Sequence, residues 1–134
     1  MATKKQQAFR AACVLAWMGV IFYFSNQANS NQVTEEIFGG LNYFVRKGAH
    51  LTEYAILLSL CQWFKLSLDD PPIKLRPQTK FVNLLPPFAV TVLYAMSDEW
   101  HQSFVPARSA LFSDVLIDST GAAIAALIWF WRMK

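Results

Sequence analysis

The chain has 134 residues, of which 54% are hydrophobic and 16% are charged, whereas a soluble domain has about a quarter of its residues charged. This composition disfavours a soluble protein, and the length predicts a single domain over 1–134. The basic residues behind the net charge of +3 form no single patch, so the sequence predicts no nucleic-acid binding. Cys13 and Cys61 lie inside apolar runs, which indicates buried free thiols rather than a disulfide.

Four apolar segments follow one another along the chain and predict helices that cross a membrane. Each is shorter than the roughly 20 residues that span a bilayer, so flanking polar residues must complete each span. The first segment shows no polar face at helical spacing, which disfavours a soluble four-helix bundle. The predicted fold class is an all-α integral membrane bundle of four short transmembrane helices. We expect the spans at about 8–25, 47–65, 84–101 and 113–131.

The segments around these spans carry further signals. The first span resembles a signal peptide in its basic start and short apolar core, but three further spans favour an uncleaved helix. Between the first two spans, apolar residues at helical spacing predict a short interfacial amphipathic helix, with Gly39 and Gly40 as a weak point or break. The polar, proline-rich segment 66–80 is expected to be a connector. The third span is expected to begin near Pro86 and Pro87, because proline fits the first turn of a helix.

The distribution of lysine and arginine predicts the orientation in the membrane. With the N-terminus in the cytoplasm, most of the 12 basic residues lie on the inner side, including Lys74 and Arg76 of the connector. Arg46, Lys47 and Arg108 are then the ones outside. The positive-inside rule therefore predicts a multi-pass protein with both termini in the cytoplasm.

Ionisable residues of three predicted spans converge. Counted from the ends of the spans at about 1.5 Å per residue, Glu53, Asp98 and Asp118 lie at similar depth, in the outer half of the bundle. Such residues are unfavourable in lipid and indicate a functional interior. Gly121 and nearby alanines give the fourth span a side where helices can pack closely. Polar residues recur at helical spacing in three groups: Arg46, His50 and Glu53; Asp98, His101 and Gln102; Asp114 and Asp118.

Four stretches carry a resemblance to a known family: FSNQ at 24–27, RKGAHLTEY at 46–54, DEWHQSFVPAR at 98–108 and SDVLIDSTGA at 113–122. In order and joint spacing they resemble the VanZ-like membrane proteins, named for an accessory protein of glycopeptide-resistance clusters that confers low-level teicoplanin resistance. The resemblance covers nearly the whole chain and implies a small multi-span protein of the bacterial cytoplasmic membrane, without implying a settled reaction. The polar residues that match the family's signature are Gln27, Arg46, Lys47, His50, Glu53, Asp98, Glu99, His101, Gln102, Arg108, Asp114 and Asp118.

Two positions depart from the family's pattern. The usual Pro-Gly-Arg is Pro106-Ala107-Arg108 here, which leaves open whether the backbone keeps the positive φ that glycine permits. Asp118 stands where the family often has asparagine, so this chain carries an additional charge there.

One function that fits these residues is an enzyme acting on an outer-leaflet lipid or a lipid-linked cell-wall intermediate. Arginine binds phosphate bidentately, and histidine with a neighbouring carboxylate can serve as a base or nucleophile. Asp114 and Asp118 are candidate ligands of a divalent cation that would neutralise phosphate charge. The candidate catalytic residues are His50, Glu53, Asp98, Glu99 and His101, and the candidate substrate-binding residues are Gln27, Arg46, Lys47, Gln102 and Arg108.

A second function is a non-catalytic protein that sequesters a lipid or a lipoglycopeptide antibiotic at the same pocket. A purely structural alternative pairs Arg108 or Lys47 with one of the three convergent acids to hold the bundle together. A transporter is disfavoured, because four short spans are few and show no repeat. The sequence leaves the oligomeric state and the question of catalysis open.

Overall fold

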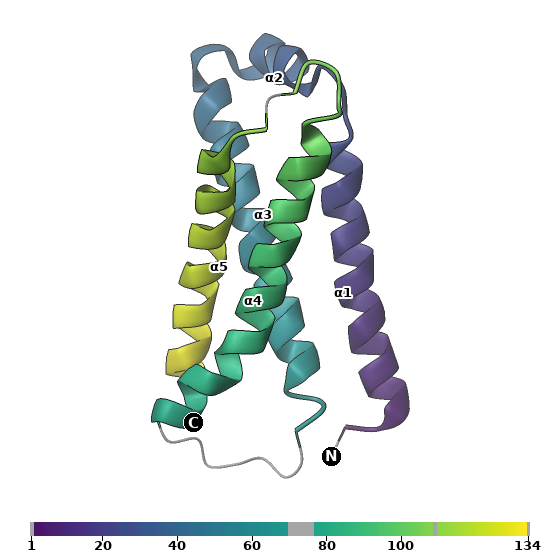
Figure 1. The fold of residues 1–134 in the computed structure, drawn as a ribbon, viewed down its shortest axis with the longest axis vertical. Helices are drawn as coiled ribbons and strands as arrows, with labels where there is room; N and C mark the ends of the chain where they lie inside the picture. The colour runs from purple at the N-terminus through teal and green to yellow at the C-terminus, as the bar shows by residue number, and fades with distance from the viewer. Residues whose placement is uncertain (1, 70–76, 109, 134) are drawn as a thin grey trace.

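The structure, a computed structural model, consists of helices and short connections throughout the residues that it describes, 2–69, 77–108 and 110–133. The helices in chain order are α1 (Lys4–Ser25), α2 (Ser30–Phe38), the 3-10 helix η1 (Gly39–Leu41), α3 (Asn42–Lys65), α4 (Pro77–Gln102) and α5 (Phe112–Arg132). The long helices α1, α3, α4 and α5 stand side by side, α2 lies across one end, and both termini lie at the other end (Figure 1). The all-α prediction is confirmed.

Three of the long helices are long and apolar enough to cross a membrane. They are α1, residues Gln78–Gln102 of α4, and α5. The fourth long helix, α3, has 24 residues, but Lys47, His50, Glu53 and Gln62 interrupt its apolar sequence. Within its described residues, the structure therefore supports three of the four predicted spans and does not show the fourth.

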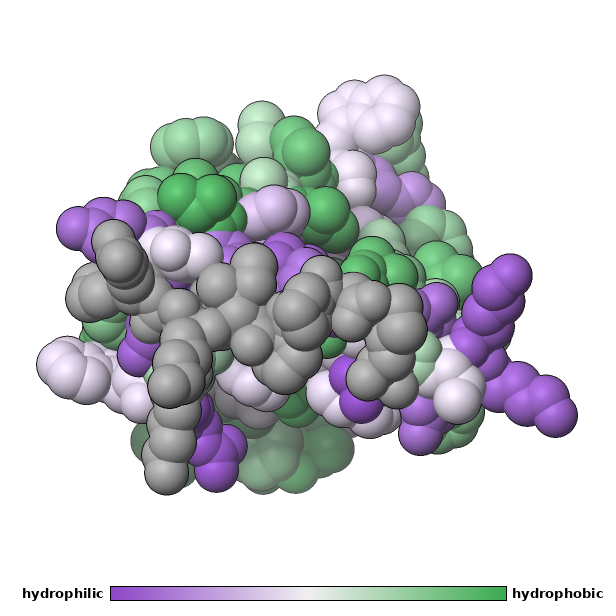
Figure 2. Space-filling view, turned by 90° about the horizontal axis from the view of Figure 1, so that it is seen from below, coloured by the Kyte–Doolittle hydropathy of each residue, from purple (hydrophilic) through white to green (hydrophobic). Residues whose placement is uncertain are grey.

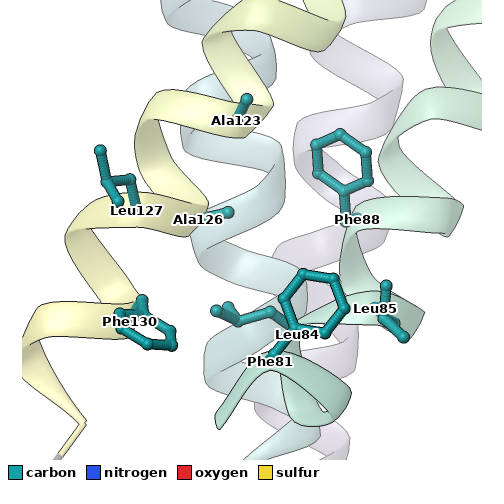
Figure 3. A pocket seen from close by; sticks show the side chains of 8 residues that line it. All are labelled: Phe81, Leu84, Leu85, Phe88, Ala123, Ala126, Leu127 and Phe130. Atoms are coloured by element: carbon teal, nitrogen blue, oxygen red, sulfur yellow. The ribbon is translucent and has the colours of Figure 1, made fainter. Parts of the chain in front are cut away.

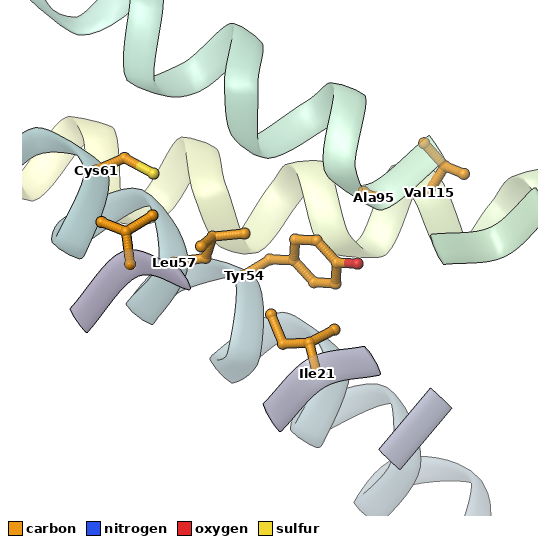
Figure 4. Packing of buried hydrophobic residues seen from close by; sticks show 7 residues of the cluster. Ile21, Tyr54, Leu57, Cys61, Ala95 and Val115 are labelled. Atoms are coloured by element: carbon orange, nitrogen blue, oxygen red, sulfur yellow. The ribbon is translucent and has the colours of Figure 1, made fainter. Parts of the chain in front are cut away.

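α3 lies at the centre of the bundle and packs against each of the other helices. Tyr54 and Leu57 of α3 are completely buried, and Ile21 of α1, Ala95 of α4 and Val115 of α5 gather around them (Figure 4). Between apolar helices in lipid, such close packing supplies most of the attraction. The central position of α3 also explains its composition, because its polar side chains face other helices rather than the surroundings of the bundle.

α3 and α5 approach each other closely at Gly121. A Cβ atom at this position would collide with the main-chain carbonyl of Leu51. Ala122 and Ala125 of α5 are buried in the same contact and pack with Leu58 of α3. The predicted small-residue side of the fourth span is confirmed at these positions.

α4 begins earlier than the sequence predicts. The helix starts at Pro77, so Pro86 and Pro87 lie inside it rather than in its first turn. Because proline has no N–H, the carbonyls of Val82 and Asn83 lack the main-chain donor that a helix normally provides. The predicted start was wrong because a helix can continue through prolines where the freed carbonyls can bond to water or to a side chain.

The segments that join the long helices differ from one another. α2 has no buried residue and ends before Gly39, whose φ of 51° confirms the predicted break. Its N-cap, Asn29, also has a positive φ, 59°, so α2 is bounded by a residue of positive φ on both sides. Of the predicted connector, residues 70–76, with Lys74 and Arg76, lie outside the described residues.

The flanks of the bundle expose large apolar side chains. Leu15 and Leu93 are 68% and 64% exposed, and an apolar groove of about 310 Å³ runs between α4 and α5 beside Phe88 and Leu127 (Figure 3). Exposed apolar side chains on the flanks suit helices that satisfy their own backbone in an apolar solvent. At the end that carries the termini, hydrophilic and hydrophobic side chains lie side by side (Figure 2).

Candidate functional site

A cleft opens at the end of the bundle that α2 covers, between the end of α1 and the beginning of α3. Its volume is about 330 Å³. Ser30 and Thr34 of α2 form part of its wall. The residues predicted from the sequence that line it are Gln27, Arg46, His50, Glu53 and Arg108.

Two arginines face this cleft without an ion-pair partner. Arg46 and Arg108 are both half-buried, and among the described residues neither forms a salt bridge. The one side-chain hydrogen bond of Arg46 among these residues joins Nη1 to the Ser30 hydroxyl at 3.4 Å, which leaves most of its five donors free. Burial lowers the pKa of Arg108, an effect that the carboxylates of Asp98 and Glu99 oppose, so its guanidinium stays charged.

Arg108 is held in place by the end of α1. Its Nη2 atom donates to the Phe24 carbonyl at 2.6 Å, and its Nε atom donates to the Gln27 carbonyl at 3.4 Å. Its Nη1 atom donates to Oε1 of Gln102 at 3.3 Å. The guanidinium therefore caps the negative end of the α1 dipole and contacts α4 at the same time.

The residue before Arg108 keeps a positive φ, a point that the sequence left open. Ala107 has a φ of 62°, so the left-handed conformation that suits glycine is kept although alanine stands there. A side chain with a Cβ atom makes this conformation about 1–2 kcal/mol less favourable. The surrounding contacts of the loop must hold the residue in this conformation.

A buried cluster lies behind the cleft at His50. The Nδ1 atom of His50 is 3.1 Å from Oδ1 of Asp118, and Glu99 completes a group whose nitrogen and oxygen atoms lie within 4.8 Å of one another. Asp118 is fully buried and Glu99 is 4% exposed. One oxygen of Glu99, Oε2, accepts a hydrogen bond from the Leu111 amide at 3.1 Å. Side chains of α3, α4 and α5 thus meet in this cluster, but of the three acids expected to converge, Glu53, Asp98 and Asp118, only Asp118 belongs to it.

Asp98 belongs to a second network that faces α1. Its Oδ2 atom accepts hydrogen bonds from the Ser25 hydroxyl at 2.7 Å and from Nε2 of Gln102 at 2.9 Å. Neighbouring residues of a helix point about 100° apart, so Asp98 and Glu99 face different partners. Asp98 and Gln102 therefore link α4 to the end of α1 and to Arg108 and do not line the cleft.

Asp114 does not join the cluster as the predicted metal ligand. It forms an ion pair with Lys47 instead, with side chains 11% and 22% exposed. This pair joins the second turn of α3 to the first turn of α5, and Lys47 does not line the cleft. Of the two predicted metal ligands, Asp118 alone belongs to the His50–Glu99–Asp118 cluster.

His101 lies apart from both the cleft and the cluster. Its Nε2 atom is 3.3 Å from Oδ1 of Asn26, and its ring stacks on Phe22 with 4.6 Å between ring centroids. Side chains two positions apart on a helix point about 200° apart, so His101 points away from the side that Glu99 faces. The structure does not support the predicted catalytic role of His101, because its neighbours are residues of α1.

Comparisons with known proteins identify the family. Residues 10–133, nearly the whole chain, match the family model VanZ/LLP1. The chain belongs to the VanZ/LLP1 family. The resemblance predicted from the sequence is thereby confirmed, and family membership together with three apolar helices identifies a multi-pass membrane protein. Searches of curated proteins and of solved structures found no match.

The VanZ/LLP1 chain has two further polar residues at this site that the sequence analysis missed. Ser25 is 5% exposed and donates to Asp98. Tyr54 is fully buried, and its hydroxyl has no hydrogen-bond partner among the described residues. Both lie inside the family's motifs, next to polar residues that were identified, and their position there is the signal that could have revealed them.

The VanZ/LLP1 site thus combines two chemical capabilities. Arg46 and Arg108 supply positive charge and hydrogen-bond donors on the wall of the cleft. Glu53 and His50, three residues apart on α3, bring a carboxylate and an imidazole to the same cleft. An oxyanion that binds the arginines would lie close to groups that can accept or donate a proton.

Proposed function

We propose that this VanZ/LLP1 protein binds a phosphate-bearing lipid or lipid-linked cell-envelope intermediate in the cleft and acts on it there. The observation that carries the proposal is the pair Arg46 and Arg108, which line one cleft without a salt bridge among the described residues. A phosphate group accepts bidentate hydrogen bonds from guanidinium and would neutralise this charge. The volume of about 330 Å³ is sufficient for part of a lipid headgroup.

The proposal places the protein in the bacterial cytoplasmic membrane with four spans. α3 crosses with the three apolar helices, because its central position shields its polar residues from lipid. Both termini lie at the end of the bundle opposite α2 (Figure 1), which agrees with termini in the cytoplasm and α2 at the outer surface. The cleft then faces the outer leaflet, where lipid-linked intermediates of the cell wall are used.

Apolar side chains beside the cleft favour a ligand with a lipid tail. Phe24 lines the cleft and is 53% exposed, and Val20, 38% exposed, lies one turn before it on the same face of α1. A headgroup bound at Arg46 and Arg108 could extend its acyl or polyprenyl chain along this side of α1. A water-soluble phosphate would make no use of that surface.

His50 and Glu53 are the residues proposed to act on the bound group. The contact between His50 Nδ1 and Asp118 fixes the imidazole and leaves Nε2 as the nitrogen that can take up or release a proton. Glu53 faces the same cleft and offers a second acid–base group. A phosphate ester held by the arginines is therefore the class of substrate that these groups suit best.

A non-catalytic role is the second candidate, and the exposed Phe24 at the cleft is the observation that favours it. A protein that sequesters an acylated molecule, such as a lipid or the lipoglycopeptide teicoplanin, needs the arginines and an apolar surface. It does not need the acid–base groups. Either role is consistent with the family's association with low-level teicoplanin resistance.

The decisive experiment compares phosphate-bearing lipids and cell-wall intermediates in cells with and without the protein. The variants are Arg46→Gln, His50→Gln and, as a control at the opposite end of the bundle, Arg132→Gln, all at equal protein levels. We expect the wild type and Arg132→Gln to change the same lipid or intermediate, and the other two variants to lose the effect. A profile that does not depend on the protein, or on Arg46, would refute the proposal. Loss in Arg46→Gln alone would favour sequestration.

A further inference from the structure

We infer that His50, Glu99 and Asp118 form a binding site for a divalent transition-metal ion. Each residue comes from a different helix, α3, α4 or α5, and their nitrogen and oxygen atoms already lie within 4.8 Å of one another. The site is separate from the arginines of the cleft, and it does not depend on which lipid the protein binds.

Two oxygen atoms of this cluster indicate that an ion binds here. Oε1 of Glu99 and Oδ2 of Asp118 are buried and have no hydrogen-bond partner among the described residues. The two residues are only 4% and 0% exposed. Leaving a buried carboxylate oxygen without a partner is unfavourable, and a bound cation would remove that cost.

The protein's own cations among the described residues do not serve this purpose. Lys47 is paired with Asp114, and Arg108 donates to main-chain carbonyls and to Gln102. His50 contacts one oxygen of Asp118, which leaves the two unpartnered oxygens as they are. With a neutral imidazole and both carboxylates ionised, the cluster would carry a charge of about −2, which a divalent ion balances.

The donor set indicates the kind of ion. One imidazole nitrogen and two carboxylates suit Zn²⁺ or Mn²⁺, whereas Mg²⁺ and Ca²⁺ prefer oxygen ligands alone. The 3.1 Å between Nδ1 of His50 and Oδ1 of Asp118 is the spacing expected of two ligands that each lie about 2.0–2.2 Å from one ion.

An ion at this site would have an open coordination position. Three protein ligands leave at least one position for water or a bound oxyanion, and His50 places the ion next to the cleft that it lines. Glu53, which faces the cleft and is not part of the cluster, would then be the remaining acid–base group. The ion would act on whatever group the cleft holds by drawing charge from its oxygen atoms.

The experiment measures metal on the full-length protein in detergent, without added lipid. The protein is treated with a chelator, incubated with Zn²⁺ or Mn²⁺, desalted, and analysed for bound metal. We expect about one ion per chain for the wild type, and an affinity at least about tenfold lower for Glu99→Gln and His50→Gln. Asp114→Asn should bind like the wild type, because Lys47 and not the cluster holds that carboxylate.

Two further measurements distinguish a loss of metal binding from misfolding of the variant. Helical content by circular dichroism must match the wild type for each variant. His50→Cys should retain Zn²⁺ and lose Mn²⁺, because thiolate is a soft ligand. A wild type that binds no ion, or Glu99→Gln that binds as tightly as the wild type, would overturn the inference. Equal metal loss in Asp114→Asn and Glu99→Gln would overturn this choice of ligands.

Discussion

Arg108 donates from Nη2 to the main-chain carbonyl of Phe24 at 2.6 Å, so a residue of the α4–α5 loop closes the end of α1. Arg108→Lys removes the planar fork that reaches two carbonyls and Gln102 at once. We expect it to lower the free energy of unfolding in detergent by about 1–3 kcal/mol. Arg46→Lys is the matched control and should change it by less than about 0.5 kcal/mol, because Arg46 makes one weak hydrogen bond. Equal losses in a denaturant titration would contradict the capping role.

Ala107 has a positive φ that favours glycine, and Ala107→Gly should therefore stabilise the protein. We expect a gain of about 1 kcal/mol, because glycine adopts this conformation without the steric cost of a Cβ atom. Ala28→Gly, at an exposed loop position between α1 and α2 without positive φ, should bring no gain. Thermal unfolding of both variants in the same detergent distinguishes the two, and a loss of stability in Ala107→Gly would count against the backbone conformation described.

The close contact of α3 with α5 makes Gly121→Ala destabilising. Its Cβ atom would collide with the Leu51 carbonyl, which cannot rotate away as a side chain can. We expect a loss of at least about 2 kcal/mol, near the upper part of the range for overpacked cores. Gly19→Ala, in α1 with no atom near the new Cβ, should instead raise stability by about 0.5–1 kcal/mol. Similar effects of the two substitutions would show that the helices are not this close.

The ion pair between Lys47 and Asp114 predicts energetic coupling between α3 and α5. A double-mutant cycle with Lys47→Gln and Asp114→Asn should give a coupling free energy of about 0.5–3 kcal/mol. Each single variant leaves one charge partly buried without its partner. The sum of the two single losses in the free energy of unfolding should therefore exceed the loss in the double variant. Strictly additive losses in the free energy of unfolding would show that the pair contributes nothing to stability.

The proposed orientation predicts which positions a membrane-impermeant thiol reagent reaches. In a background with Cys13 and Cys61 replaced by serine, Glu36→Cys on α2 should be labelled in intact cells. Lys5→Cys at the start of α1 should be labelled only after the membrane is permeabilised. Glu36 and Lys5 are both exposed in the structure, so accessibility of the residue itself does not limit the reaction. The reverse pattern would invert the orientation.

The helices and the break after α2 could be predicted from the sequence because both depend on local signals. Apolar runs define α1 and α5, and Gly39 ends α2 through a conformation that glycine readily adopts. The similar height of the polar residues of α3 and α5 could be estimated as well, because helical rise is nearly constant. His50 and Asp118, predicted from opposite halves of the chain, indeed meet.

The partners of individual side chains could not be predicted, because they depend on how each helix is rotated. Asp98 and Glu99 are neighbours in sequence, and a rotation of about 100° would exchange their roles. The apolar turns before them contain few polar residues, so the sequence gives little signal for the right rotation. The pairing of Lys47 with Asp114 depends in addition on the relative height of α3 and α5, which only the packed bundle defines.

The two prolines inside α4 limit how far this helix can move along the membrane normal. The carbonyl oxygens of Val82 and Asn83 need water or a side chain as donor, since Pro86 and Pro87 offer none. Moving these oxygens by one or two turns into the dry interior of a bilayer would remove their hydration. The double proline therefore favours positions of α4 in which this end of the helix stays near the headgroups.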